Sequence, residues 1–262
     1  MIKKKLLTKV SLITLFLIIL SACQVKKTDQ TMPTKESTAM TKEENSTNQS
    51  SETVEINSSE LPNKSFAEGS LIQAVRENDL KQVQEILKDD NYKIDEVDTQ
   101  DETPLLIATH QNSIEIAKSL IDAGADINKQ DTISDSPYLY AGAQGKTEIL
   151  RYMLEKQVPD QQKVNRFGGN ALIPAAEKGH LDNVNILLKD GRSNVDHQNN
   201  YGYTALIEAV ALTDGSSTYQ QIVKALLEGG ADKTLKDNTG RTAEDYARSL
   251  GYSEILTSLN EY

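Results

Sequence analysis

Most of the chain repeats one short sequence pattern at a nearly fixed interval. Residues 103–108 read TPLLIA, and related copies begin at Ser136, Asn170, Thr204 and Thr242, at intervals of 33, 34, 34 and 38 residues. A divergent first copy begins at Gly69, which is 34 residues before Thr103. A period of this length predicts a stack of similar units, each of which buries its apolar face against its neighbours.

Each unit is predicted to contain two helices joined by a turn. Thr103 can cap a helix amino terminus, and Pro104 suits the first helical position, where the N–H has no intrahelical partner. Second amphipathic segments follow the turns, as in residues 114–121 (IEIAKSLI), and glycines such as Gly124 end them. The expected fold class is therefore an all-α repeat solenoid in which hairpins or loops connect the units.

These residues resemble the ankyrin repeat. The resemblance rests on the period near 33, the TPLLIA start, the Gly-His turn at Gly179–His180 and the Gly-Ala-Asp sequence at residues 230–232. It covers about residues 65–262 and implies about six ankyrin repeats, with polar first and last units as caps. It also implies a module that binds a protein partner through its concave surface.

The amino terminus predicts export and lipid anchoring. Four lysines precede or begin an apolar run at residues 10–20, which is too short to span a bilayer as a stable helix, although a short membrane anchor remains an alternative. The sequence Leu20-Ser21-Ala22-Cys23 resembles the lipobox of bacterial lipoproteins and holds the chain's one cysteine. This resemblance implies that residues 1–22 are a signal peptide and that Cys23 becomes the lipidated amino terminus.

Residues 23–64 are expected to form the lipidated cysteine and a disordered spacer. The segment is rich in Ser, Thr, Lys and Glu and has no aromatic residue, so it cannot bury enough apolar surface to fold. We expect the protein on the extracytoplasmic face of the cell membrane, held by its acyl chains alone. The long polar spacer favours a Gram-positive bacterium.

Charge limits the classes of partner. The formal net charge is −11, and loss of residues 1–22 would remove four Lys and no acids, which gives −15. Such a balance argues against nucleic-acid binding. Solubility is the favoured explanation of the acidity, and a basic protein partner is the alternative. We expect a monomer.

Nothing in the sequence predicts catalysis, a cofactor or a metal. His110, His180 and His197 lie in different units, and none has a Cys or His at metal-ligand spacing. No phosphate-binding loop or nucleophile motif is present. The chain is therefore predicted not to be an enzyme, and a small hydrolase that uses His197 with a nearby carboxylate is a remote alternative.

Candidate partner-binding residues lie mainly on the tips between units. Aromatic and Arg side chains are the residue types most often found at interface hot spots. Phe167, Tyr201 and Tyr203 are expected on adjacent tips as one patch, or else as residues that stiffen those tips. The full set of candidates is Glu102, Asp135, Arg166, Phe167, Tyr201, Tyr203, Tyr219 and Arg241.

Three positions depart from the repeat pattern. Tyr138 and Tyr140 occupy places where the pattern requires buried Leu, so both are expected in the core. Pro174 is unusual because a proline removes a helix donor. Residues 212–220 are expected to form an enlarged loop between the two helices of the fifth unit, either as a ligand site or as a tolerated insertion.

The favoured hypothesis is a lipid-anchored, extracytoplasmic protein-interaction module without enzymatic activity. The main alternative is an immunity or inhibitor protein that blocks a secreted toxin or hydrolase near the membrane.

Overall fold

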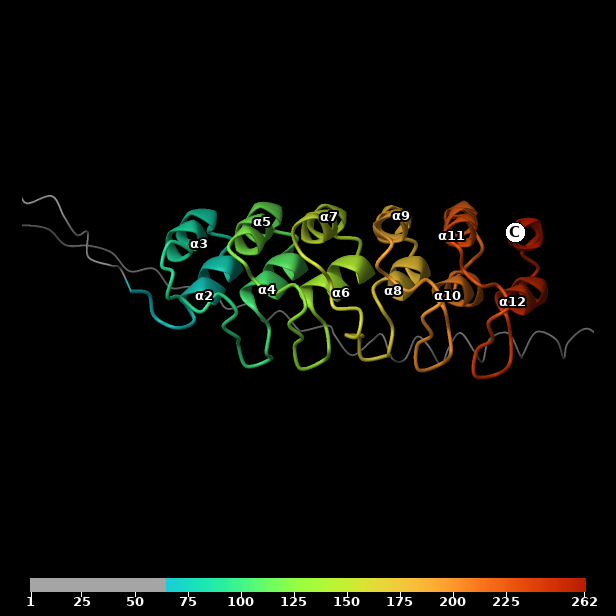
Figure 1. Ribbon diagram of the computed structural model, residues 1–262, viewed down its shortest axis with the longest axis horizontal. Coiled ribbons are helices and arrows are strands. Elements are labelled where there is room, and N and C mark those ends of the chain that lie inside the picture. The colour runs from blue at the N-terminus through green and yellow to red at the C-terminus, as the bar shows by residue number, and fades with distance from the viewer. Residues whose placement is uncertain (1–64) are drawn as a thin grey trace, which may run out of the picture. The chain divides into compact units, whose positions relative to one another are not determined.

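The computed structural model describes residues 65–262. The predicted signal peptide (1–22), the predicted lipidation site Cys23 and the spacer (23–64) lie outside the described residues. Residues 65–262 form six helix pairs in two layers (Figure 1). The first helices are α2 (Ser70–Arg76), α4 (Pro104–Gln111), α6 (Pro137–Ala143), α8 (Leu172–Glu177), α10 (Ala205–Ala211) and α12 (Ala243–Leu250). The second helices are α3 (Leu80–Ile86), α5 (Ile114–Asp122), α7 (Thr147–Lys156), α9 (Leu181–Asp190), α11 (Ser217–Glu228) and α13 (Ser253–Glu261).

The expected all-α solenoid of about six repeats is confirmed. Loops project from the first-helix layer on the side away from the second helices (Figure 1). These loops are turns, because residues 65–262 contain no β-strand, so the connection is a tip loop rather than a paired β-hairpin. No helix within residues 65–262 has the length and apolar character needed to cross a membrane.

Side-chain caps fix where most first helices begin. The hydroxyl oxygens of Thr103, Ser136, Thr204 and Thr242 each accept a hydrogen bond from the backbone N–H three residues later, at 3.1 to 3.2 Å. At Thr242 the bond is reciprocal, because the Asp245 carboxylate accepts from the Thr242 backbone N–H. Each cap satisfies an N–H that has no partner within its helix. The predicted helix starts therefore follow from local chemistry.

The fourth unit accommodates Pro174 by starting its first helix later. Asn170 occupies the place of the capping Thr or Ser of other units, but the cap residue of α8 is Ala171. Asn170 Oδ1 accepts from the backbone N–H groups of Leu172 and Ile173 at 3.1 and 3.3 Å. Helix α8 begins at Leu172, so Pro174 is its third residue. The first N–H groups of a helix have no intrahelical acceptor, so the missing donor costs little there.

A carboxylate from the following loop caps the first unit. Gly69 occupies the cap position of α2 and has no side chain to offer. The Glu96 side chain, which is 1% exposed, caps the helix in place of a side chain at Gly69. Its Oε2 accepts from Gly69 N at 2.6 Å, and its Oε1 accepts from Ile72 N at 2.9 Å. The Tyr92 hydroxyl also donates to Oε2, at 3.0 Å. This buried carboxylate fixes the first helix to the loop that leads to the second unit.

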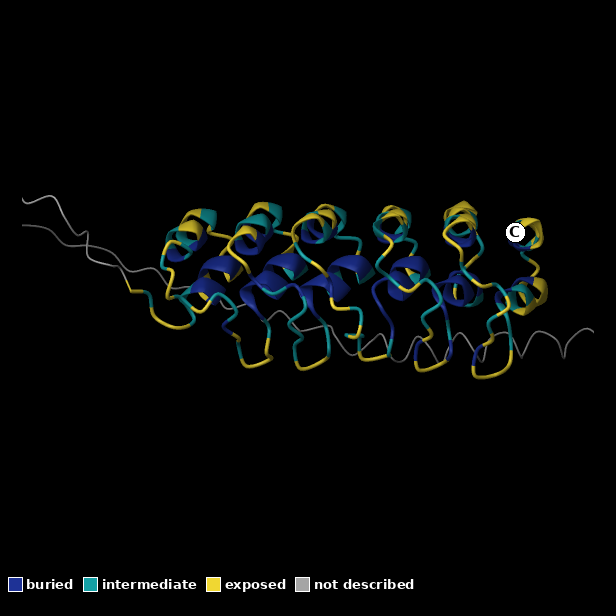
Figure 2. Cartoon of the chain, in the orientation of Figure 1, coloured by how far each residue is buried: buried dark blue, intermediate teal, exposed yellow. Residues whose placement is uncertain are grey.

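The core lies mainly along the first-helix layer, between neighbouring units (Figure 2). In α4 the residues from Pro104 to Thr109 are all buried, whereas α5 buries only one face. Each first helix packs against its own second helix and against the first helices of adjacent units. Burial of apolar area along this row is the main favourable contribution to folding.

The two tyrosines expected in the core behave differently. Tyr138 is 2% exposed, as predicted, and its hydroxyl lies 3.2 Å from Ser193 Oγ. For Tyr140 the prediction is wrong, because the side chain is only partly buried and packs on His110 with 4.1 Å between ring centroids. A buried tyrosine hydroxyl needs a hydrogen-bond partner. Ser193 supplies one for Tyr138, and Tyr140 keeps its hydroxyl near water.

The enlarged loop of the fifth unit is shorter than expected. Helix α11 starts at Ser217, so residues 217–220 are helical and only residues 212–216 form the connection. Neighbouring side chains hold this connection, because the Tyr252 hydroxyl donates to Thr213 O at 2.6 Å. The Gln220 side chain also donates to Gly215 O at 3.0 Å. The extra residues therefore lengthen α11 and pack against the last unit.

Candidate partner-binding surface

Every tip between units is built on the same side-chain hydrogen bonds. An Asp or Asn begins each tip, and its Oδ1 accepts backbone N–H groups from the residues two and four positions later. In the fifth unit, Asn199 Oδ1 accepts from Tyr201 N at 2.9 Å and Tyr203 N at 3.0 Å. The five residues are Asp98, Asp131, Asn165, Asn199 and Asp237. The sequence analysis missed them, although they recur at the intervals of the helix caps, 33, 34, 34 and 38 residues.

Backbone hydrogen bonds connect some of these tips to their neighbours. Thr132 N donates to Gln100 O at 3.0 Å, and Asn200 N donates to Phe167 O at 2.9 Å. Asn238 N donates to Tyr201 O at 3.1 Å. Side chains on the linked tips are therefore held at fixed separations before any partner arrives, which reduces the entropy lost on binding.

Glycine is required where one tip closely approaches the next. Gly202 has φ +77°, and a Cβ added to it would lie 2.7 Å from Asn238 N of the next tip. Gly240 occupies the corresponding position in the last tip with φ +83°. A Cβ added to Gly240 would have no atom within 4 Å. We expect Gly202→Ala to lower the free energy of unfolding by about 2 kcal/mol more than Gly240→Ala. Both substitutions place a Cβ on a left-handed backbone, but only the Cβ at position 202 clashes with the next tip. Urea unfolding of the two variants measures the difference. Equal destabilisation would show that the tips do not pack as described.

Exposed apolar side chains lie on three consecutive tips. Ile133, Phe167 and Tyr201 are 49%, 45% and 57% exposed. The structure places Phe167 and Tyr201 on the tips joined by the Asn200–Phe167 hydrogen bond. Tyr203 is less accessible: it is partly buried, and its hydroxyl lies 3.3 Å from that of Tyr246. The expected aromatic patch is thus formed by two exposed rings, with Tyr203 at its inner border.

The two candidate arginines differ in how free they are. Arg166 is exposed, with its guanidinium 5.0 Å from the Phe167 ring centroid and Nη1 4.0 Å from Asp135 Oδ2. Arg241 stacks on Tyr246 at 3.8 Å and donates to Ser249 Oγ at 2.8 Å. Arg166 can therefore turn toward a partner beside Phe167, whereas Arg241 already has contacts within the last unit.

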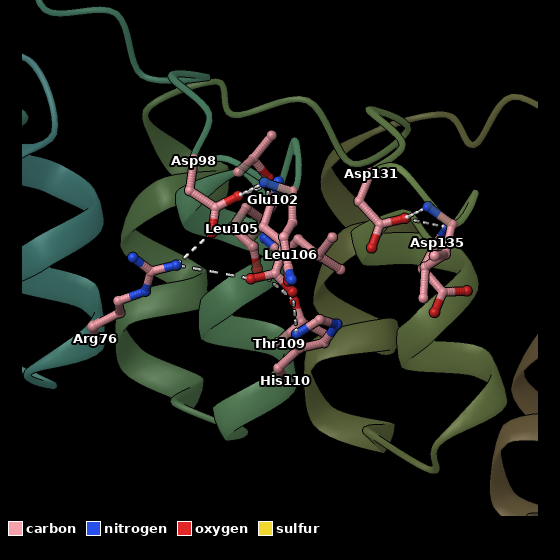
Figure 3. A network of polar contacts seen from close by, with 12 residues as sticks. Arg76, Asp98, Glu102, Leu105, Leu106, Thr109, His110, Asp131 and Asp135 are labelled. Atoms are coloured by element: carbon pink, nitrogen blue, oxygen red, sulfur yellow. Dashed lines mark hydrogen bonds and ion pairs between the residues drawn. The ribbon is translucent and has the colours of Figure 1, made fainter. Parts of the chain in front are cut away.

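Glu102 belongs to a polar network that joins the first two units (Figure 3). Arg76 pairs with Asp98 and lies 3.9 Å from Glu102 Oε2. Glu102 Oε1 lies 3.2 Å from His110 Nδ1. Burial raises the pKa of Glu102 and lowers the pKa of His110, so the imidazole is neutral at pH 7. Glu102 is thus held by neighbours rather than free for a partner.

Asp135 is the second partly buried carboxylate along this surface. It lies on the tip that follows the Glu102 network, near Asp131 (Figure 3). Burial and the nearby Asp131 charge raise the pKa of Asp135, and the positive charge of Arg166 acts in the opposite direction. The ionised form of this carboxyl is destabilised in the isolated domain.

Tyr219 is engaged between units. Its hydroxyl donates to Glu177 O, 42 residues earlier, at 3.0 Å, and a Cβ added to Gly179 would lie 3.4 Å from the hydroxyl oxygen. The side chain is partly buried. Its contacts explain the ordered start of α11, and we leave Tyr219 out of the proposed binding surface.

A buried carboxyl that the sequence analysis missed lies in α10, hydrogen-bonded to the residue that begins the tip of the fifth unit. Glu208 is 6% exposed, and its Oε1 accepts from Asn199 Nδ2 at 2.8 Å. Burial, with the nearby Glu177 charge, raises the pKa of Glu208 to about 8. Its position in the repeat could have revealed it, because Glu208 lies four residues after Thr204, where the other units carry uncharged residues. These residues are Ile107, Tyr140, Pro174 and Tyr246.

Within residues 65–262, His197 lacks the carboxylate partner that the hydrolase alternative requires. His197 Nε2 lies 2.7 Å from Gly168 O, and no described carboxylate is hydrogen-bonded to the ring. In the same part of the chain, no group of three or more His, Cys, Asp or Glu side chains could hold a metal ion. The arrangement required by the hydrolase alternative is not present there.

The comparison with known families decides the family. The family model described as ankyrin repeats (3 copies) matches residues 48–131, 71–162, 124–197 and 139–237. The chain belongs to the ankyrin repeat family. An ankyrin repeat domain is generally a protein-binding module, so the concave surface and its tips are the part of the molecule to consider for function.

Three similar proteins are bacterial ankyrin repeat proteins. The ankyrin repeat protein EF0377, known from a crystal structure, is 62% identical in sequence to this chain and superposes with a TM-score of 0.75. The match covers 76% of this chain and 100% of EF0377. An ankyrin repeat domain from Acinetobacter baumannii AYE is 47% identical with a TM-score of 0.71, covering 74% and 98%. The putative ankyrin repeat protein YahD of Escherichia coli K12 is 40% identical over 166 residues, which are 63% of this chain and 82% of the relative.

Proposed function

We propose that this protein is a lipid-anchored, extracytoplasmic interaction module that binds a protein partner through its tips and concave surface. The observation that carries the proposal is the pair of exposed rings, Phe167 and Tyr201, on tips fixed to each other by a backbone hydrogen bond. Exposed aromatic side chains on a rigid surface are suited to interface hot spots, because little conformational entropy is lost when they are buried.

The anchor is supported by the amino-terminal sequence. The lysines, the apolar run of residues 10–20 and the lipobox-like Leu20–Cys23 place the one cysteine where lipidation would occur. Residues 24–64 would then act as a tether between membrane and domain. We expect native full-length chain to partition into the detergent phase on phase separation and a Cys23→Ser chain to remain in the aqueous phase. Equal partitioning would contradict the anchor without bearing on the binding surface.

The partner is proposed to be basic. The formal net charge is −11, and several carboxyls of the first helices and tips, including Asp135, Glu177 and Glu208, have raised pKa values because burial destabilises their charge. A positively charged partner would stabilise these ionised groups and would approach faster at low salt.

Surface cross-linking from native cells, read by mass spectrometry, tests the proposed binding surface. We expect a Phe167→Ala/Tyr201→Ala/Tyr203→Ala protein to lose at least tenfold in partner recovery. The substitutions remove the two exposed rings and the partly buried ring of Tyr203 beside them. The matched control is Val158→Ala/Tyr262→Ala, which removes exposed apolar side chains, 72% and 51% exposed, away from the tips. Circular dichroism verifies the fold of both. Equal recovery with the triple variant would contradict the assignment.

A further inference from the structure

We propose that a pocket at the start of α9 binds a sugar, whose hydroxyl groups meet the buried amide of Asn183. The pocket has a volume of about 340 Å³, within the range of roughly 300–1,000 Å³ that small-molecule sites occupy. Its walls come from the places where three successive second helices begin, namely Gly145 and Thr147, residues 179–183, and Thr218. None of these residues belongs to a tip, so the inference goes beyond the proposed binding of a protein partner.

Asn183 departs from the repeat at a buried position. It is the third residue of α9 and is 0% exposed. The third residue of α5, of α7 and of α13 is an isoleucine in each case, at positions 116, 149 and 255. Burial of an amide in place of an apolar side chain costs free energy unless both of its polar atoms find partners. The fourth unit therefore carries a polar group where other units carry core.

Only one half of the Asn183 amide is satisfied within the described domain. Its Nδ2 donates to Ala141 O at 2.9 Å and to Gly142 O at 3.0 Å, near the carboxyl end of α6. These bonds fix which atom is nitrogen, because a carbonyl oxygen accepts only from the NH₂ group. Oδ1 is buried and has no hydrogen-bond partner among residues 65–262. With Nδ2 held by α6, Oδ1 is the acceptor that Asn183 has left for a ligand in the pocket.

The start of α9 adds free donors beside this acceptor. The helix has ten residues, and its cap residue His180 makes no side-chain cap bond. Within residues 65–262, the backbone N–H groups of Asp182 and Asn183 have no acceptor. A hydroxyl group can accept from such an N–H and donate to Oδ1 through the same oxygen atom, whereas an ammonium only donates and a carboxylate only accepts.

The charges around the pocket favour a neutral ligand. Among the lining residues, Asp182 carries the one carboxylate, which repels anions and offers further acceptors to hydroxyl groups. Burial and the nearby Lys178 charge lower the pKa of His180, so the imidazole is neutral at pH 7. The positive amino end of α9 disfavours a cation. A sugar is neutral and presents several hydroxyl groups on a rigid ring, so it suits both the donors and the acceptors.

Glycines keep the pocket open. A Cβ added to Gly145 would lie 2.8 Å from His180 Nδ1, and one added to Gly179 would lie 3.6 Å from the Thr218 methyl carbon. The hydroxyl groups of Thr147 and Thr218 come from the units on either side of α9. Several polar groups therefore converge on one small pocket, which is the arrangement that orients a small ligand.

Two-dimensional proton–nitrogen NMR of the full chain, titrated separately with glucose, galactose, mannose and N-acetylglucosamine, tests the pocket. We expect at least one of these sugars to shift the amide signal of Asp182 saturably, with a Kd on the order of 1 mM. We expect Asn183→Ile to weaken that sugar at least about tenfold, because the buried acceptor is lost. The variant should fold, since isoleucine is the residue that other units carry there.

Asn185→Ile is the matched control. It removes an amide from an exposed position of the same helix, and we expect its affinity to remain within about twofold of the wild type. If Asn183→Ile does not fold, Asp182→Ala retains the test, with an expected loss of at least about threefold.

Three results would overturn the proposal. Absence of a saturable shift with all four sugars would mean that water alone completes Asn183 Oδ1. Equal affinity in the wild type and in Asn183→Ile would place the sugar elsewhere on the domain. Inorganic phosphate or methylammonium that binds at Asp182 more tightly than every sugar would show that the pocket selects charge rather than hydroxyl groups.

Discussion

A Glu208→Gln protein is expected to be more stable than the wild type at pH 9 by on the order of 3 kcal/mol. In the folded chain the pKa of Glu208 is about 8, whereas the ordinary value is 4.5. Below pH 4.5 the carboxyl is protonated in both states and its contribution to stability is complete. Between pH 4.5 and 8 unfolding releases a proton, so stability falls as pH rises, by at most about 1.4 kcal/mol per unit.

Glutamine removes this titration and keeps the main contact. Its side-chain oxygen can accept from Asn199 Nδ2 as Glu208 Oε1 does. Urea unfolding at pH 5, 7 and 9 should show a smaller fall in the free energy of unfolding for the variant than for the wild type. Glu148→Gln, on the exposed face of α7, should follow the wild type. Parallel curves for wild type and Glu208→Gln would show that the buried carboxyl is ionised throughout.

A Glu96→Ala protein is expected to lose about 3 kcal/mol of stability, mostly in its first unit. The buried carboxylate accepts from the backbone N–H groups of Gly69 and Ile72 and from the Tyr92 hydroxyl. Removal leaves the backbone N–H groups of Gly69 and Ile72 without an acceptor, at a helix end that has no side-chain cap of its own, whereas the Tyr92 hydroxyl still has Ala67 O at 3.1 Å. Because repeats are stabilised mainly by their neighbours, a terminal unit loosens before the rest of the array.

Hydrogen exchange locates the effect of Glu96→Ala. We expect faster exchange at the amides of α2 and α3, with α8 to α11 unchanged. Glu96→Gln should be intermediate, because an amide can still accept at one atom but cannot replace both carboxylate oxygens. Glu115→Ala, at an exposed position of α5, is the control. Uniform acceleration over all units would mean that the first unit unfolds only together with the rest.

The helices could be predicted from sequence because their signals are local. Thr103 and Thr204 cap helices within three residues of themselves, and the apolar spacing of residues 114–121 determines which face is buried. The enlarged loop was misjudged for the opposite reason. Residues 217–220 are helical, and the Tyr219 hydroxyl holds the start of α11 by donating to Glu177 O, 42 residues earlier. A contact between units so far apart in sequence cannot be recognised by comparing the repeats with one another.

The candidate surface was predicted in part. Tip positions follow from the period, so Phe167 and Tyr201 were placed on adjacent tips, and both are exposed. The partial burial of Tyr203, by contrast, depends on Tyr246 from the next unit. The role of Glu208 depends on burial between α8 and α10, which residue type alone does not reveal. Periodicity thus predicts where side chains lie along the array, and packing between units decides which of them are free.

The most direct test of the binding surface is hydroxyl-radical footprinting of the domain with and without the partner recovered by cross-linking. Phe167, Tyr201 and Tyr262 are 45%, 57% and 51% exposed, so all three rings should be oxidised in the free protein. If the partner binds through the tips, oxidation of Phe167 and Tyr201 should slow several-fold on binding while Tyr262 stays unchanged. Protection of Tyr262 with Phe167 and Tyr201 still fully reactive would contradict the account.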